Sequence, residues 1–194
     1  IISPLLLSAQ NTGGFKVRLN SGDFTPKQNI EGLSKTDDVF TKSMFGDNYY
    51  VVLQFSTLPT DNVKAQLKNS GIILVDYIPN NAFTAVVSKD FDISSLQSNG
   101  IRSIFCLDMN QKTVPLLVDG IFPSHAVKSV GTIDLTITTY EKLSLDYVTA
   151  SFEQLNITVL EEVSIFRNFT IRIPQENFKA LVNLAFVQWV EPID

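Results

Sequence analysis

The sequence predicts an α+β fold made of two tandem ferredoxin-like βαββαβ units, each an antiparallel sheet with two helices on one face, preceded by an N-terminal arm. The first observation is that residues 49–108 read as strand, helix, two hairpin strands, helix and strand, which is the order of the split βαβ motif. The second is that the same order returns about 85 residues later, over residues 132–192. We therefore expect a duplicated chain.

The repeat can be followed through positions that share one spacing. Apolar residues on the helix faces and in the closing strands form such pairs: Val63 with Val148, Leu67 with Phe152, Leu96 with Leu181, Ile101 with Phe186, and Ile104 with Trp189. Gly71 pairs with Asn156 at the same spacing, and both residue types tolerate the left-handed conformation that ends many helices. This regularity favours a duplication over one mixed domain.

The N-terminal arm and leader occupy residues 1–48. Residues 1–9, IISPLLLSA, could be the end of a secretion signal or an ordered apolar arm packed on the body, and both interpretations stay open. Residues 13–20 alternate apolar and polar side chains as in a half-buried strand. Residues 28–48 are polar and irregular, so we expect a loop there, with one short helical turn near residues 38–44.

The first unit spans residues 49–110. Its expected elements, in order, are a strand at 49–55, a helix capped by Thr60 and ended by Gly71, hairpin strands at 72–78 and 83–87, a helix capped by Asp90 or Asp92, and a strand at 101–107. The apolar positions of these elements predict one core, formed by Val51, Leu67, Phe83 and Leu96. The first strand is apolar on both faces, which is unusual for a strand that borders water.

A linker at residues 111–131 leads into the second unit at residues 132–194. The linker contains three turn-forming residues and a strand-like piece at 114–118. The expected elements of the second unit are a strand from Ile133, a helix capped by Ser144, hairpin strands at 157–164 and 169–173, a helix begun by Pro174, and a strand at 186–191. Its apolar positions predict a second core, formed by Leu135, Phe152, Phe169 and Leu181.

The composition of the chain argues against two classes of partner. The formal net charge is −5 and the pI is about 4.9, so the chain lacks the positive field that drives binding to nucleic acid or anionic lipid. No apolar run approaches the roughly 18 residues needed to span a bilayer. We therefore expect no nucleic-acid partner and no membrane insertion.

The sequence offers few residues for catalysis. The single histidine, His125, has no sign of a neighbouring nucleophile and carboxylate, so we interpret it as a solvated loop residue. The single cysteine, Cys106, lies in the apolar run IRSIFCL and is interpreted as a buried thiol rather than a nucleophile. No hydrolase, metal-ligand or phosphate-loop motif is present. We expect no catalytic residues, no metal and no cofactor in this segment.

The sheet faces that the helices leave open are the candidate surfaces. In the second unit this face is polar and can border water; it carries Thr136, Thr138, Thr170 and Arg172. In the first unit it is too apolar to stay bare; it carries Tyr50, Val52, Gln54, Thr84 and Val86. The chain's own arm, the second unit or an external partner could cover it. We regard these positions, Gln54 apart, as candidate partner-binding residues.

Residues 49–87, with the sequence YYVVLQFSTLPTDNVKAQLKNSGIILVDYIPNNAFTAVV, resemble the N-terminal pro-region of secreted subtilisin-like serine proteases of the Bacteroidetes type. The likeness is carried by the tyrosine-rich strand, the Leu-x-x-x-Gly-Ile helix end and the Tyr-Ile-Pro-x-Asn-Ala-Phe hairpin. Residues 14–30 resemble the leader of the same precursors, and residues 188–194, QWVEPID, resemble the join to their catalytic domain. The chain departs from the simple family by having two units instead of one.

This resemblance implies a non-catalytic segment of an exported precursor, located in the periplasm, at the cell surface or outside the cell. Pro-regions of this family act as folding chaperone and inhibitor, or as accessory domains, and their partner is the catalytic domain of the same precursor. Their carboxyl tail enters the protease cleft, so Pro192, Ile193 and Asp194 join the candidate partner-binding residues. The alternative is a ferredoxin-like module that binds a ligand or partner unrelated to proteolysis.

The tail carries one further expectation. Proline lacks an N–H and fixes φ, so Pro192 is expected to stop sheet pairing and to redirect the chain outward. If so, the residues that would enter a protease cleft lie at or beyond Ile193.

Overall fold

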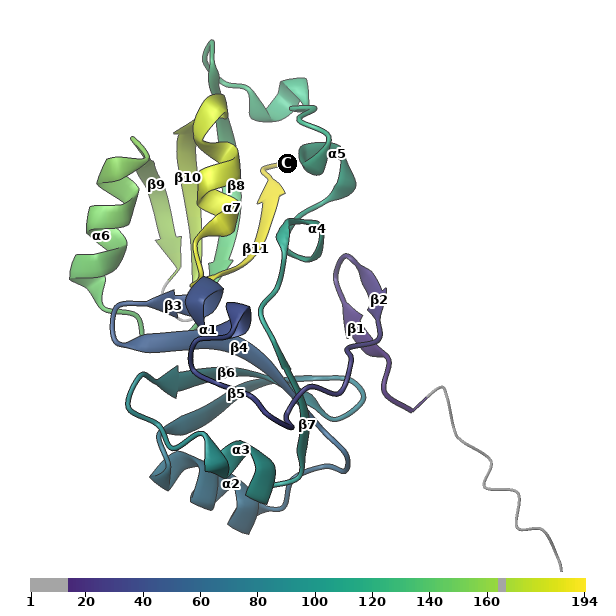
Figure 1. Ribbon diagram of the computed structural model, residues 1–194. Helices are drawn as coiled ribbons and strands as arrows, with labels where there is room; N and C mark the ends of the chain where they lie inside the picture. Colours follow the sequence, from purple (N-terminus) through teal and green to yellow (C-terminus); the bar gives the residue numbers. More distant parts are fainter. Residues whose placement is uncertain (1–13, 164–166) are drawn as a thin grey trace, which may run out of the picture.

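A computed structural model describes residues 14–163 and 167–194 as a mixed α+β structure with antiparallel sheets (Figure 1). The question of a signal remnant or an arm at residues 1–9 lies outside the described residues. The arm that is described begins with a two-stranded hairpin of β1 (Val17–Leu19) and β2 (Gly22–Phe24). The helical turn expected near residues 38–44 is confirmed as α1 (Asp38–Ser43), and the short strand β3 (Met44–Phe45) follows it.

The larger sheet is built around β4 (Asn48–Phe55). The other strands are β5 (Ile72–Ile78), β6 (Ala82–Ser88) and β7 (Ile101–Phe105), and they lie in the order β7-β4-β6-β5, with β3 also paired to β4. The helices α2 (Asp61–Asn69) and α3 (Ser94–Ser98) lie together on one face of this sheet (Figure 1). The Thr60 side chain caps α2 as expected, accepting from the Val63 N–H.

The second sheet contains β8 (Thr132–Thr139), β9 (Thr158–Val163), β10 (Asn168–Pro174) and β11 (Val187–Pro192), in the order β11-β8-β10-β9. With the short β3 left aside, the strands of both sheets, counted along the chain, therefore lie in the order fourth, first, third, second. The helices α6 (Leu145–Gln154) and α7 (Phe178–Asn183), the latter preceded by the 3-10 turn η3 (Gln175–Asn177), cover one face. Gly71 and Asn156 both have positive φ, at +83° and +52°, as their place at the helix ends predicts.

Each sheet shares a core with its helices. Val51, Leu67, Phe83 and Leu96 belong to one buried cluster, and Leu135, Phe152 and Leu181 to another against which Phe169 packs. Both cores expected from the sequence are therefore confirmed.

The linker does not contain the strand expected at residues 114–118. It forms two short helices, α4 (Met109–Lys112) and α5 (Pro115–Val118), and the 3-10 turn η1 (Ser124–Ala126). The strand expectation was wrong because Pro115 occupies the first turn of α5, where the missing N–H of proline costs nothing and its fixed φ suits a helix. Thr113, just before α5, forms an isolated parallel bridge with Val190.

The final strand corrects two sequence expectations. A register shift between Val187 and Trp189 places Val190 opposite Ile137, as Ile104 lies opposite Leu53 in the other sheet. Val190 is therefore the buried counterpart of Ile104, and the pairing of Ile104 with Trp189 was wrong. The strand β7 has the same register shift, between Ile101 and Ser103, so the two closing strands match at a spacing of 86 residues rather than 85. The pairing of Ile101 with Phe186 was wrong for the same reason, because Val187 is the counterpart of Ile101.

Pro192 does not stop the pairing of β11. It lies opposite Leu135 in the ladder, and the next residue, Ile193, still donates its N–H to the Asp134 carbonyl at 3.3 Å. Because β11 is the edge strand of its sheet, the proline can direct its missing donor away from β8 without losing a ladder bond. The chain continues along the sheet to Ile193.

Candidate functional site

The open face of the larger sheet is filled by the chain itself. Tyr50 and Val86 are 2% exposed and belong to the same buried cluster as the core of the second sheet. Val52 is fully buried against Val17 of the arm. Thr84 is 5% exposed and its hydroxyl bonds to the backbone N–H and carboxylate of Asp76.

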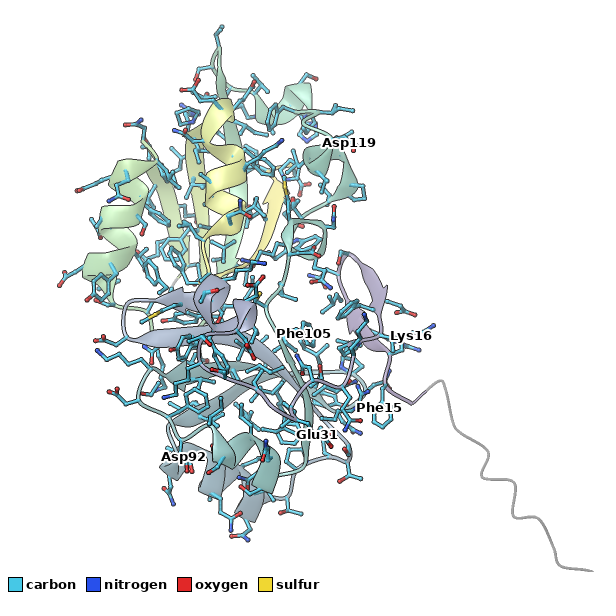
Figure 2. The ribbon with its side chains drawn as sticks, in the orientation of Figure 1. Phe15, Lys16, Glu31, Asp92, Phe105 and Asp119 are labelled. Carbon is cyan, nitrogen blue, oxygen red and sulfur yellow. The ribbon has the colours of Figure 1, made fainter. Side chains whose placement is uncertain are left out.

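The sequence left three possible covers for this face: the arm, the second unit or an external partner. In the structure the arm and the second unit together cover it. In this conformation Tyr50, Val52, Thr84 and Val86 are at most 5% exposed, so they offer almost no surface to an external protein partner. Further contacts of the arm lie beside them: Arg102 sits over the Phe15 ring at 4.1 Å, and Phe24 packs edge-on against Phe105 at 5.2 Å between ring centroids. Figure 2 labels Phe15, at the arm, and Phe105, in the larger sheet.

The second sheet keeps its open face partly exposed. Thr136, Thr138, Thr170 and Arg172 are all half-buried there, on the side away from α6 and α7. The Arg172 guanidinium makes a two-pronged ion pair with Asp134, at 2.6 and 2.7 Å, and the Asp134 side chain is only 3% exposed. The two bonds hold the Arg172 guanidinium in one position. The open face therefore carries the threonine hydroxyls and one cation that is already paired with Asp134.

Trp189 also lies on this open face, because it is paired with Thr138 in the ladder. Its indole N–H donates to Glu191 at 2.9 Å. Trp189 was missed as a surface residue because the spacing of 85 aligned it with the buried Ile104, whereas its structural counterpart is Ser103. The C-terminal candidates Pro192 and Ile193 continue this strand, and Asp194 is exposed beyond it.

A polar groove of about 280 Å³ lies where the two sheets meet. Arg167 and Asp76 both line this groove. The Arg167 guanidinium donates two hydrogen bonds, of 3.1 and 2.9 Å, to the Asp76 carboxylate. Burial acts to raise the pKa of Asp76, but the hydrogen bonds and positive charge of Arg167 outweigh it, so the pKa is lowered. Thr138 and Trp189 line the same groove, so one end of the open face runs into the junction.

A larger cavity, of about 500 Å³, lies on another part of the junction. Segments from both halves of the chain converge on it; the lining residues are Lys42, Tyr50, Cys106, Leu107, Asp108, Met109, Lys112, Tyr140, Asn183 and Ala185. We call it the junction cavity. Its walls are mostly apolar, with a few convergent polar groups, which is the usual make-up of a small-molecule site.

Lys112 is the most unusual residue of the junction cavity. It ends α4 and is 5% exposed, and its Nζ donates to the carbonyl oxygens of Val182 at 3.2 Å and Leu184 at 2.9 Å. These carbonyls lie at the C-terminal end of α7, where a cation is favoured. Burial lowers the pKa of Lys112 to about 8, although the negative charge of Asp108, and that of Cys106 once its thiol ionises, act in the opposite direction.

Two tyrosines meet in the same cavity. The rings of Tyr50 and Tyr140 pack edge-on with centroids 5.4 Å apart. The Tyr50 hydroxyl donates to the Lys142 carbonyl at 3.4 Å, whereas the buried Tyr140 hydroxyl has no hydrogen-bond partner within residues 14–163 and 167–194. Burial raises the pKa of both phenols, so both are neutral hydroxyls able to donate.

The remaining chemical candidates agree with their sequence interpretation. Cys106 is partly buried, and burial raises the pKa of its thiol, so it is a poor nucleophile near neutral pH. His125 is exposed in η1. No group of three or more potential metal ligands occurs in the part of the chain that the structure describes. Within that part, no helix has the length and hydropathy to span a membrane.

Comparison with known proteins gives a family match for the first part of the chain. Residues 18–108 match a family described as a domain of unknown function (DUF8729). The matched part runs from the arm through the larger sheet, which the structure shows packed together. No curated protein and no solved structure matches the chain.

Proposed function

We propose that this chain is a non-catalytic, propeptide-like domain of an exported subtilisin-like serine protease. In this proposal it assists folding of the catalytic domain and inhibits it, or serves as an accessory domain, in the periplasm, at the cell surface or outside the cell. The catalytic domain follows Asp194 in the same precursor. The proposal is supported by the resemblance of residues 14–30, 49–87 and 188–194 to such pro-regions.

The same proposal includes the finer fold assignment. Residues 49–110 and 132–194 are two tandem ferredoxin-like units, the first preceded by an arm at 1–48 and the two joined by a linker at 111–131. The shared strand order of the two sheets supports this assignment, as does the matching position of the left-handed Gly71 and Asn156 at the helix ends.

One observation supports the second unit as the one that meets the protease. The open face of the larger sheet is already buried under the arm and the second unit, whereas the open face of the second sheet remains partly exposed. The second unit is therefore the one that presents a free sheet face. The protease surface contacts Thr136, Thr138, Thr170 and Arg172, and Trp189 adds an aromatic anchor of the kind that dominates many interfaces.

The test is binding of the chain to the catalytic domain of the same precursor, measured by surface plasmon resonance, with and without the change Thr170→Lys on the open face. We expect Thr170→Lys to weaken binding at least about tenfold, because it places a long cation in the centre of the contact. The matched control is Asn62→Lys on the exposed side of α2, which adds the same charge on a helix of the first unit. Equal weakening by both variants, or none by either, would contradict the assignment of this face.

A further inference from the structure

The junction cavity holds polar groups that the proposed function leaves unused. Three of them are buried or partly buried donors: the Lys112 ammonium, the Tyr140 hydroxyl and the Cys106 thiol. The cavity volume of about 500 Å³ lies within the range of small-molecule sites. Nothing in the propeptide proposal requires such a cavity between the two sheets.

The donors of the junction cavity are not fully satisfied by the protein. An ammonium has three N–H donors, and Lys112 directs two of them to the carbonyls of Val182 and Leu184. The Tyr140 hydroxyl has no partner in the described part of the chain. A buried donor without an acceptor is costly, so the cavity lacks an acceptor rather than a donor.

The charges around the junction cavity also favour a ligand that is a hydrogen-bond acceptor. No carboxylate within the described ranges forms an ion pair with Lys112. Asp108 is exposed and its carboxylate accepts from the Gln111 N–H at 3.1 Å, as the cap of α4. Lys42, also in the lining, is paired with Asp38 at 2.6 Å. The buried cation is therefore held by two carbonyl dipoles and by no carboxylate at ion-pair distance, although the exposed Asp108 carboxylate acts on it from further away.

We propose that the junction cavity binds a small monocarboxylate whose apolar part packs against Tyr50, Leu107 and Met109. Its carboxylate accepts from Lys112 and from the Tyr140 hydroxyl, which supplies the missing acceptor. A phosphate or sulfate fits the cavity less well, because no arginine lines it to add to its few donors. The walls are contributed by both halves of the chain, so ligand and inter-sheet contact stabilise each other.

The test uses phenylacetate as the probe and phenylacetamide as its uncharged match, titrated into the isotope-labelled chain and followed by NMR. We expect phenylacetate to shift the amide signals of residues around the junction cavity, and phenylacetamide to bind at least about tenfold more weakly, because hydrogen bonds to charged groups are the stronger kind. Lys112→Met should abolish this preference for the acid. Tyr140→Phe should weaken phenylacetate about fivefold or more.

The control for the loss of a lysine is Lys128→Met, since Lys128 is exposed and lies outside the cavity lining. It should bind phenylacetate as the unchanged chain does. The acid-against-amide comparison is made on the unchanged chain, so it stands even if Lys112→Met fails to fold. Equal binding of acid and amide, or signals that shift elsewhere or not at all, would overturn the proposal. Neither result would affect binding to a protease.

Discussion

At the scale of single residues, Lys112 provides a direct check on the packing of the junction. Its side chain is almost completely buried and is held by two carbonyls at the end of α7. Its pKa falls from an ordinary value of 10.5 to about 8 in the folded chain. Between these two pH values the unfolded chain binds more protons at this site, so the free energy of unfolding rises with pH.

We therefore predict that the unfolding free energy of the unchanged chain, relative to Lys112→Met, increases by about 2–3 kcal/mol between pH 7 and pH 10. The measurement is urea unfolding of both proteins across this pH range. Comparing the two proteins removes the contribution of the other groups that titrate there. A constant difference would show that the Lys112 ammonium is solvated, and the junction would then be packed more loosely than the structure describes.

At the scale of secondary-structure elements, α6 is held to its sheet by two buried side chains, Val148 and the larger Phe152. Phe152 is 5% exposed and packs between Phe169 and Phe186, with ring centroids 5.9 and 6.4 Å away. We expect Phe152→Ala to reduce the unfolding free energy by roughly 3–5 kcal/mol, the usual cost of emptying a buried phenylalanine site. Chemical denaturation at neutral pH measures this loss.

The control on the same helix is Leu145→Ala. Leu145 is 72% exposed in the first turn of α6, so its truncation should change stability by less than about 0.5 kcal/mol. A loss below about 1 kcal/mol for Phe152→Ala would mean that the buried face of α6 is assigned incorrectly.

The elements also show how far the sequence could be interpreted. Hydrophobic spacing and helix-end residues predicted α2, the strands of both sheets and the residues of both cores, because these depend on local pattern. The helix at Pro115 and the register of β11 around Trp189 could not be predicted in the same way. Short apolar runs fit a strand or a buried helix equally well, and the register of a strand is fixed by its partner strand, so a change of spacing from 85 to 86 residues shows only in the paired sheet.

At the scale of the whole molecule, the contact between the sheets determines which surfaces are free. The sequence showed that the face of the larger sheet around Tyr50 and Val52 is too apolar to stay bare, but not which segment covers it. Pairing of distant segments leaves no local signal in a sequence. The structure shows that the arm and the second unit share this role. The Lys112 site was missed for the same reason, because its carbonyl partners lie about 70 residues further along the chain.

The correction at Pro192 sharpens the account of how the chain would inhibit a protease. Because β11 stays paired and the Ile193 N–H still bonds to β8, the tail up to Ile193 belongs to the sheet. A tail that lies in a protease cleft binds as an extended strand through main-chain hydrogen bonds. In the proposed inhibition, the residues that could do so therefore lie at or beyond Asp194, rather than at Ile193.

The most direct test of the proposed function is a titration against the catalytic domain of the same precursor, with hydrolysis of a peptide substrate as the readout. Residues 1–194 are compared with the same chain extended by the next ten or so residues of the precursor. We predict that both bind, that residues 1–194 inhibit poorly, and that the extended chain inhibits much more tightly. Equally tight inhibition by both would contradict the role of the tail, and no binding by either would contradict the propeptide function itself.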